Sequence, residues 1–175
     1  MRSDVAAALL EARADLQAAD EAGANALHYA TLSNQSDMVS LLCNAPQALV
    51  NIGDRSGRTP LHFASWNCSN PDIAKSLLDC HADPNSRDDT QSTPLMYVRS
   101  SDTARHLLAA RAEVGLVDNA QRTTLHHAVR FNDTALLDLL VHIHGAPLNA
   151  SDAAGQTVLD IAVAYSDARA VQVVL

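Results

Sequence analysis

The sequence predicts an all-α fold, a helical solenoid built from short repeated helix pairs. An aspartate recurs along the chain with spacings of 34, 34, 30 and 34 residues, close to the period of about 33 residues of one class of helical repeats. After each aspartate come a helix-capping residue, a short apolar helix, a second helix start and a pair of aliphatic residues. The aspartates are Asp20, Asp54, Asp88, Asp118 and Asp152.

The composition of the 175-residue chain fits closely stacked helices and excludes other classes. Hydrophobic residues make up 47% of the chain but aromatic residues only 3%, which favours Ala-, Leu- and Val-rich helices over an aromatic-filled sandwich or barrel. The net charge is -8, and Lys75 is the one lysine. A protein that tracks nucleic-acid phosphates is expected to be basic, so we predict no nucleic-acid partner.

The cysteines and the start of the chain predict a reducing environment. Cys43, Cys68 and Cys80 are odd in number and form no C-x-x-C pair, so we expect free thiols rather than disulfides or a zinc knuckle. The apolar run before Glu11 is too short for a signal peptide, and no run of about 18 apolar residues predicts membrane insertion. We expect a cytoplasmic, intracellular protein, with the nucleus as the alternative.

The first helix of each pair begins after a capping residue. Thr59 precedes Pro60 and Thr93 precedes Pro94, which places a capping hydroxyl before a proline at the first helical position. The other three first helices are expected to start after Asn25, Thr123 and Thr157.

The second helix of each pair has its own start signal and ends in two aliphatic residues. The start signals are Ser36-Asp37, Asn70-Pro71-Asp72, Ser101-Asp102, Asn132-Asp133 and Ser166-Asp167. The aliphatic pairs are Leu41-Leu42, Leu77-Leu78, Leu107-Leu108, Leu139-Leu140 and Val173-Val174. A single helix pair cannot bury both of its faces, so neighbouring pairs must stack to supply the core.

One segment carries a motif that is specific to a family. The motif T-P-L-H-x-A occurs as Thr59-Pro60-Leu61-His62-Phe63-Ala64, and Ala82-Asp83-Pro84-Asn85 is similar to the end of the same repeat. Over nearly its whole length the chain resembles the ankyrin-repeat family. The resemblance divides the single domain 1–175 into an N-terminal half-repeat (1–18), four repeats (19–52, 53–86, 87–116 and 117–149) and a truncated fifth repeat (150–175).

Several positions depart from the family pattern. Between the capping threonine and the leucine pair, the second repeat has two extra residues, around 68–71, and the third has two fewer, around 99–101. Gln91 and Gln121 replace a turn glycine, Arg13, His81 and Arg111 replace a helix-end glycine, and Gly145 keeps it. The third repeat also has Met96 and Val98 in place of histidine and alanine. We therefore expect residues 87–116 to open first.

The histidines do not predict a metal site. His28, His62 and His126 hold one position in different repeats, and helices of neighbouring repeats lie about 8–10 Å apart, too far to share a zinc ion that needs each nitrogen at about 2 Å. We expect each ring to bond the adjacent turn and its threonine hydroxyl. His142 and His144 are two residues apart and point to different faces of a helix.

The recurring aspartates are expected to organise the hairpin turns through Asx-type hydrogen bonds. Catalytic carboxylates form one close pair in one pocket rather than a regular row. No nucleophile-elbow, phosphate-loop, dinucleotide or zinc-protease motif occurs in the sequence. We predict no enzyme, no catalytic residues, no cofactor and no metal.

The resemblance implies a concave binding face made of turn tips and exposed ends of the inner helices. Tryptophan, tyrosine and arginine dominate binding hot spots, which draws attention to Trp66; the alternative for Trp66 is packing beneath the two-residue insertion. Tyr29, Phe63 and Tyr97 lie further inward and are expected to pack. Carried over position by position, the face comprises Arg55, Ser56, Arg58, Trp66, Asn67, Asp89, Thr90, Ser92, Asn119, Arg122, Arg130, Phe131, Gln156 and Tyr165.

Four arginines of this face suggest a basic strip on an acidic protein. We hypothesise that the strip receives an acidic segment of a protein partner, because arginine binds carboxylates through two hydrogen bonds. The alternative is a solvated face without a ligand. The four residues are Arg55, Arg58, Arg122 and Arg130.

The sequence as a whole predicts a non-catalytic scaffold that binds a protein partner on its concave face. The alternative is the targeting arm of a larger enzyme or membrane protein, because the array opens in mid-repeat and ends at an apolar edge, 171–175, without a polar cap. Further repeats or another domain are expected beyond residue 175. The resemblance also implies that Asn85 or Asn149 is a candidate for asparaginyl hydroxylation.

Overall fold

The structure is a computed structural model that describes residues 2–46, 48–67, 70–131, 133–144, 146–165 and 171–173, without the side chains of residues 2–4, 143 and 144. Its helices are α1 (Arg2–Glu11), α2 (Ala26–Leu32), α3 (Ser36–Cys43), α4 (Pro60–Trp66), α5 (Pro71–Asp79), α6 (Pro94–Tyr97), α7 (Ser101–Ala109), α8 (Thr124–Arg130), α9 (Thr134–His144) and α10 (Val158–Ala164). Within these ranges the chain forms no β-strand.

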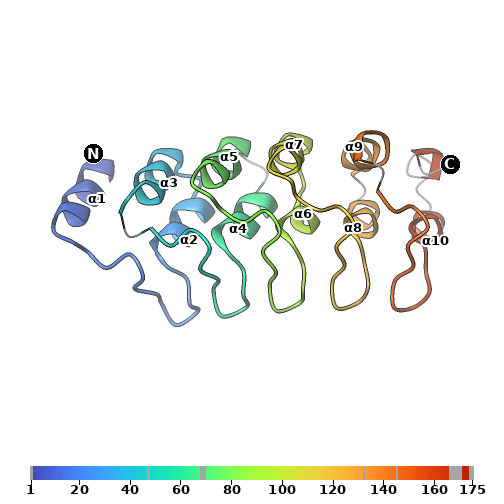
Figure 1. Ribbon diagram of the computed structural model, residues 1–175, viewed down its shortest axis with the longest axis horizontal. Helices are drawn as coiled ribbons and strands as arrows, with labels where there is room; N and C mark the ends of the chain where they lie inside the picture. Colours follow the sequence, from blue (N-terminus) through green and yellow to red (C-terminus); the bar gives the residue numbers. More distant parts are fainter. Residues whose placement is uncertain are drawn as a thin grey trace.

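The helices stand in two rows (Figure 1). The odd-numbered helices, here called outer helices, form one row, and the even-numbered inner helices form the other, with hairpin turns projecting beyond the inner row. Neighbours pack together within each row, as α3 does with α5 and α4 with α6. The predicted helical solenoid is therefore confirmed.

The core lies between the two rows and consists mainly of aliphatic side chains. Leu61, Leu95 and Leu125 hold the same position in α4, α6 and α8 and are at most 1% exposed. Leu77 of α5 and Leu107 of α7 are fully buried in the same cluster. Burying one leucine is worth about 1.5–3 kcal/mol, so each helix pair depends on its neighbours for stability.

Each hairpin turn is organised by its aspartate. Oδ1 of Asp54 accepts hydrogen bonds from the backbone amides of Ser56 at 2.9 Å and Arg58 at 3.0 Å. The other four turn aspartates accept from the same two positions, two and four residues further on, at 2.8 or 2.9 Å. The predicted Asx-type role is confirmed in all five turns.

Backbone hydrogen bonds also join successive turns to one another. The amide of Arg55 donates to the carbonyl of Ala22 at 2.8 Å, and the amide of Asn119 donates to the carbonyl of Thr90 at 2.9 Å. The two remaining pairs of neighbouring turns are linked in the same way. The five turns therefore form a continuous ladder, which fixes the spacing of the residues at their tips.

The residues that replace the expected glycines adopt left-handed backbone conformations. Gln91 has φ 61° and Gln121 has φ 57°, whereas Gly57 supplies φ 74° at the same turn position. The helix-end residues Arg13, His81 and Arg111 have φ between 60° and 68°. A side chain in this region costs about 1–2 kcal/mol relative to the right-handed conformation. The expected helix-end glycine, Gly145, lies outside the described residues.

The third helix pair, which has two residues fewer than the family pattern, contains a shortened inner helix. Helix α6 spans four residues, whereas α2, α4, α8 and α10 span seven. Val98 leaves the helix with an extended backbone. The Thr93 hydroxyl is buried without a hydrogen-bond partner among the described residues, because Met96 replaces the histidine that bonds the capping threonine in α4 and α8.

Other sequence predictions fall partly outside the described residues. Cys43 is buried, Cys80 is half-buried, and both are free thiols as predicted. Cys68 and Ser69, in the two-residue insertion, are not described, nor are Asn132, Ser166, Asp167 and Val174 of the predicted helix signals.

Candidate functional site

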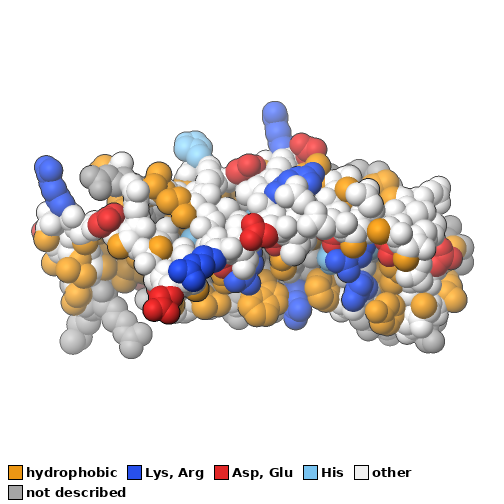
Figure 2. Space-filling model, turned by 90° about the horizontal axis from the view of Figure 1, so that it is seen from below, with side chains coloured by type: hydrophobic (Ala, Val, Ile, Leu, Met, Phe, Trp, Pro, Cys, Tyr) orange, Lys and Arg blue, Asp and Glu red, His pale blue; other side chains and the backbone are white. Residues whose placement is uncertain are grey.

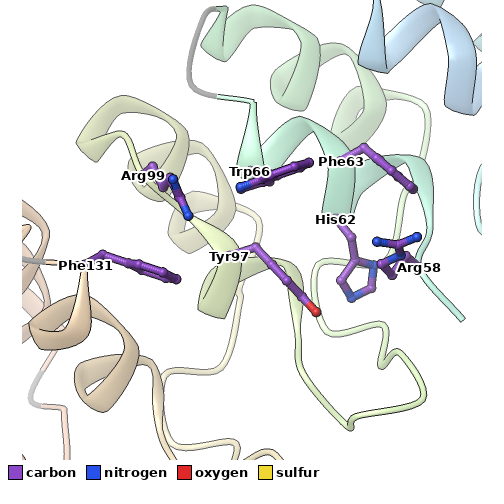
Figure 3. A pocket seen from close by; sticks show the side chains of 7 residues that line it. All are labelled: Arg58, His62, Phe63, Trp66, Tyr97, Arg99 and Phe131. Carbon is purple, nitrogen blue, oxygen red and sulfur yellow. The ribbon is translucent and has the colours of Figure 1, made fainter. Parts of the chain in front are cut away.

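Seven side chains line a hollow of about 200 Å³ on the inner-helix face (Figure 3). They come from the turn before α4, from α4 itself, from α6 and the segment after it, and from the residue after α8. The lining residues are Arg58, His62, Phe63, Trp66, Tyr97, Arg99 and Phe131. Cofactor and small-molecule pockets usually measure about 300–1,000 Å³, so this hollow better suits one or two side chains of another protein.

The hollow belongs to a longer surface with exposed large apolar side chains. Trp66 is 49% exposed and Phe131 is 40% exposed. Exposed large apolar residues also occur in α2 and at α10, namely Tyr29, Leu32, Val163 and Tyr165. Figure 2 shows hydrophobic and basic side chains interspersed along one long edge of the molecule. The inner-helix face is therefore mixed in character, with apolar patches beside positive charges.

Arg58 forms an internal ion pair at the edge of the hollow. Its Nη2 lies 2.7 Å from Oδ2 of Asp54, and its Nε donates to the same oxygen at 3.0 Å. The guanidinium carbon also lies 5.0 Å from the centroid of the Phe63 ring. Burial alone would raise the pKa of Asp54, but the hydrogen bonds from Arg58 outweigh burial and lower that pKa below 3.8.

Arg122 is neutralised in the same manner two turns further along. Its Nη2 lies 2.8 Å from Oδ2 of Asp118, which also lies 3.0 Å from Nε2 of His127. Two of the four arginines in the hypothesised basic strip are thus paired with turn aspartates. The strip is interrupted at these positions, and Arg55 and Arg130 remain its exposed members.

Arg99 differs from both of these arginines. Its guanidinium carbon lies 4.7 Å from the centroid of the Phe131 ring, a distance at which a cation is attracted to the aromatic face. It forms no hydrogen bond or ion pair with any residue that the structure describes. Arg99 therefore presents an unneutralised charge to the hollow.

The three recurring histidines join neighbouring repeats and are structural, as predicted. Nδ1 of His62 accepts from the Thr59 hydroxyl at 3.0 Å, and its Nε2 donates to the carbonyl of Ser92 at 3.1 Å. His28 and His126 reach the following turn at 3.0 and 3.3 Å. Burial lowers the pKa of His28 and His62, so both rings are neutral at pH 7. In the described part of the chain no three metal-ligating side chains come together.

Comparison with known proteins places this architecture in a family. A family model of ankyrin repeats in three copies matches residues 2–88 and 95–175. The chain belongs to the ankyrin-repeat family. Ankyrin repeats generally mediate protein–protein interactions and are generally non-catalytic modules. No helix among the described residues has the length and apolarity needed to cross a membrane.

The curated relatives of this ankyrin chain are much larger proteins. The transient receptor potential channel pyrexia of Drosophila melanogaster is 33% identical over 123 residues, which are 68% of this chain and 13% of the channel. Neurogenic locus notch homolog protein 1 of Danio rerio is 32% identical over 127 residues, or 71% of this chain and 5% of that protein. The tyrosine-protein kinase Shark of Drosophila melanogaster is 32% identical over 129 residues, or 71% of this chain and 14% of the kinase.

The structure distributes the residues expected on the ankyrin concave face over three places. Arg58, Trp66 and Phe131 line the hollow. Six of the expected residues are exposed in the hairpin turns, namely Arg55, Ser56, Asp89, Thr90, Asn119 and Gln156, and Arg122 is half-buried beside them. Asn67, Arg130 and Tyr165 lie at the ends of α4, α8 and α10. Ser92 is only 5% exposed, so the exposed surface does not include its side chain.

Four lining residues, His62, Phe63, Tyr97 and Arg99, were not among those expected on the binding face. Phe63 and Tyr97 do pack, as expected, with their rings edge-on to those of His28 and His62 at centroid distances of 5.6 and 5.7 Å. Both rings nevertheless remain half-buried and expose one side to the hollow. The two missing residues in the third repeat pointed to this region, because the shorter α6 ends at Tyr97, two residues before Arg99, but they did not specify the contact of Arg99 with Phe131.

The two asparagines considered for hydroxylation have different surroundings. Nδ2 of Asn85 donates to the carbonyl of Arg111 at 3.2 Å, and its Oδ1 accepts from the amide of Glu113 at 2.8 Å. Asn149 is exposed. Asn85 therefore has a structural role in joining two successive repeat ends.

Proposed function

We propose that this chain is a non-catalytic scaffold that binds a protein partner along its concave, inner-helix face. The supporting observation is the hollow on that face, where Trp66 is 49% and Phe131 40% exposed although large apolar side chains are usually buried. Exposed aromatic residues around a depression, with arginines beside them, are typical of protein-binding hot spots. A stack of repeats also offers an extended surface for such a partner.

The charges of this face favour a protein partner over a nucleic acid. The chain has a net charge of -8, which opposes the approach of a polyphosphate. The positive charges at the hollow are few, and that of Arg58 is already balanced by Asp54. A protein with a few separate carboxylates is therefore a better match for these few positive charges than a nucleic acid with a phosphate at every nucleotide.

The alternative is that these repeats are the targeting arm of a larger enzyme or membrane protein. Relatives of the chain include a channel and a kinase, and the matched segments make up 13% and 14% of them. Under this alternative the same face would recruit the substrate or regulator of the attached part. The full open reading frame that encodes the chain distinguishes the two functions.

Affinity capture with a paired variant tests the proposal. The wild-type chain and a Trp66→Ala, Arg130→Ala variant are used to capture proteins from a lysate, and mass spectrometry identifies them. A His142→Ala variant is the control, because His142 is 63% exposed on the outer helix α9. We expect proteins that the wild type and the control retain and the paired variant loses. Equal capture by all three chains would contradict binding on the inner-helix face.

A further inference from the structure

Arg99 is held in place beside the hollow by its neighbours in sequence and in space. Val98, directly before it, is 1% exposed and anchors the extended segment that follows α6. The guanidinium carbon of Arg99 lies 4.7 Å from the centroid of the Phe131 ring, which belongs to the next helix pair. The attraction of a cation to an aromatic ring is not a hydrogen bond, and Arg99 donates no hydrogen bond to a described residue, so its N–H groups remain available beside the hollow.

Asp54 neutralises the charge of Arg58, whereas no carboxylate among the described residues forms an ion pair with Arg99. An adjoining hollow is lined by Arg99 together with the acidic residue Asp133. Oδ1 of Asp133 accepts a hydrogen bond from the amide of Leu136 at 2.9 Å, at the start of α9, and no ion pair joins it to Arg99 in the part of the chain that the structure describes. The guanidinium of Arg99 is therefore available to an anion from outside the chain.

A second donor faces the same space. Figure 3 shows the indole nitrogen of Trp66 pointing across the hollow toward the guanidinium of Arg99. An indole nitrogen can only donate a hydrogen bond, and Trp66 forms no hydrogen bond to a described residue. The N–H groups of Arg99 and the indole N–H of Trp66 therefore both face the hollow without an acceptor among the described residues.

The other walls of the hollow offer apolar surface. The rings of Tyr97, Phe63 and Phe131 line it, and the hydroxyl of Tyr97 points away to Oδ2 of Asp88, at 2.6 Å. Both nitrogens of His62 are engaged by Thr59 and Ser92. The hollow therefore combines an apolar basin with donors on one rim.

We propose that this hollow is the anchor site for a partner peptide in which an aspartate or glutamate lies next to a large apolar residue. The carboxylate binds Arg99 and the indole N–H of Trp66, and the apolar side chain enters the basin between Trp66, Tyr97 and Phe131. A guanidinium can bind a carboxylate through two parallel hydrogen bonds. This inference rests on the proposed function and specifies the chemistry of its partner.

A random peptide library displayed on phage and selected against the intact chain tests the proposal. We expect the selected peptides to be enriched in an acidic residue next to an aromatic or large aliphatic one. Trp66 is the sole tryptophan and lines the hollow, so its fluorescence reports directly whether a synthetic copy of a selected peptide binds there. Peptides without an enriched acidic residue, or a preference for phosphorylated over carboxylate peptides, would overturn the proposal.

A double-mutant cycle then tests the contact with Arg99. We expect replacement of the peptide's glutamate by glutamine to weaken binding to the wild type about tenfold, as loss of a charged hydrogen bond does, but to weaken binding to Arg99→Gln less than about twofold. Arg105→Gln is the matched control, because Arg105 is exposed on the outer helix α7. Circular dichroism confirms that each variant keeps its helices.

The outcomes separate this inference from the function on which it rests. If Trp66→Ala abolishes binding but Arg99→Gln shows no coupling to the peptide carboxylate, the anchor site is wrong and binding on the inner-helix face stands. If the selected peptides bind Trp66→Ala and Phe131→Ala as tightly as the wild type, or if no peptide is selected, both proposals fail.

Discussion

The Nε2–H of His62 donates a hydrogen bond to the backbone carbonyl of Ser92, 30 residues further along the chain, at 3.1 Å. The opposite ring nitrogen accepts from the hydroxyl of Thr59 at 3.0 Å. One ring therefore caps its own helix and holds the next hairpin turn. Because the same arrangement recurs at other inner helices, the turn tips keep a fixed spacing along the inner-helix face.

Replacing His62 by alanine is expected to destabilise the fold by about 2–4 kcal/mol, because the substitution leaves a cavity and removes two buried hydrogen bonds. Urea unfolding followed by circular dichroism measures the effect. His142→Ala is the control, and its exposed side chain predicts a change within about 0.5 kcal/mol. Similar unfolding midpoints for the two variants would contradict the structural role of His62.

The buried histidines also predict that acid destabilises the fold. Burial lowers the pKa of His28, His62 and His127 below the ordinary value of 6.5. As pH falls through 6.5, the unfolded chain binds protons that the folded chain does not, so the free energy of unfolding decreases. Well above 6.5 these residues cause no pH dependence, because they are neutral in both states.

Urea unfolding at about pH 7.5 and about pH 5.5 measures this effect. We expect the wild type to lose stability at the lower pH and His62→Ala to lose less, because one shifted histidine is gone. A further loss is expected below pH 3.8, where hydrogen bonds hold the pKa of Asp54, Asp88 and Asp118 below the ordinary value despite their burial. Equal or greater stability at pH 5.5 would contradict the prediction.

Hydrogen bonds within one turn or between neighbouring turns could be predicted from the sequence. The residues of the candidate site could be predicted only in part. The turn bonds of Asp118 and the bonds of His126 follow from the repeat period, because their partners lie in the same or the next turn. Ser92 was expected on the exposed face but is buried; its carbonyl accepts the bond from His62 and its hydroxyl lies 3.0 Å from that of Thr90. The position of Arg99 depends on where a shortened helix ends and on a contact with the next helix pair, which no local pattern specifies.

The third repeat is expected to open before its neighbours. Its inner helix has four residues, the Thr93 hydroxyl is buried without a partner among the described residues, and Gln91 and Arg111 have left-handed backbones. Native-state hydrogen exchange measures this directly, since amides of a locally opening unit exchange before the rest. We expect the amides of residues 87–116 to exchange faster than those of 53–86 and 117–149. Equal protection across the three segments would contradict the prediction.

A Met96→His variant tests the cause of this weakness. The introduced ring would sit where His62 and His126 sit in α4 and α8, able to bond the Thr93 hydroxyl and the following turn. We expect slower exchange in residues 87–116 and a gain of about 1 kcal/mol in stability. No change in exchange would show that the missing hydrogen bonds are not the reason for opening.

Replacing Gln121 by glycine is expected to raise the free energy of unfolding by up to about 1 kcal/mol, because φ is 57° at this position and glycine adopts that angle without a steric cost. The greater freedom of glycine in the unfolded chain offsets part of this gain. Gln121→Ala is the control, since it removes the side chain but keeps the strained Cβ. Thermal and urea unfolding should rank the glycine variant above the wild type and the alanine variant no higher than it.

The positive charge next to Trp66 predicts that anions quench its fluorescence preferentially. A unit charge several Å away changes the energy of an exposed anion by up to about 1 kcal/mol in water. Arg99→Gln is therefore expected to lower the iodide quenching constant of Trp66 by roughly a third to a half at low salt, while leaving quenching by neutral acrylamide unchanged. Arg105→Gln removes the same charge from an outer helix and should change neither constant.

Because Trp66 is the only tryptophan of the chain, the measurement requires no label and no partner. A loss of acrylamide quenching in Arg99→Gln would indicate that the indole had become buried, whereas unchanged iodide quenching would show that Arg99 does not direct its charge into the hollow.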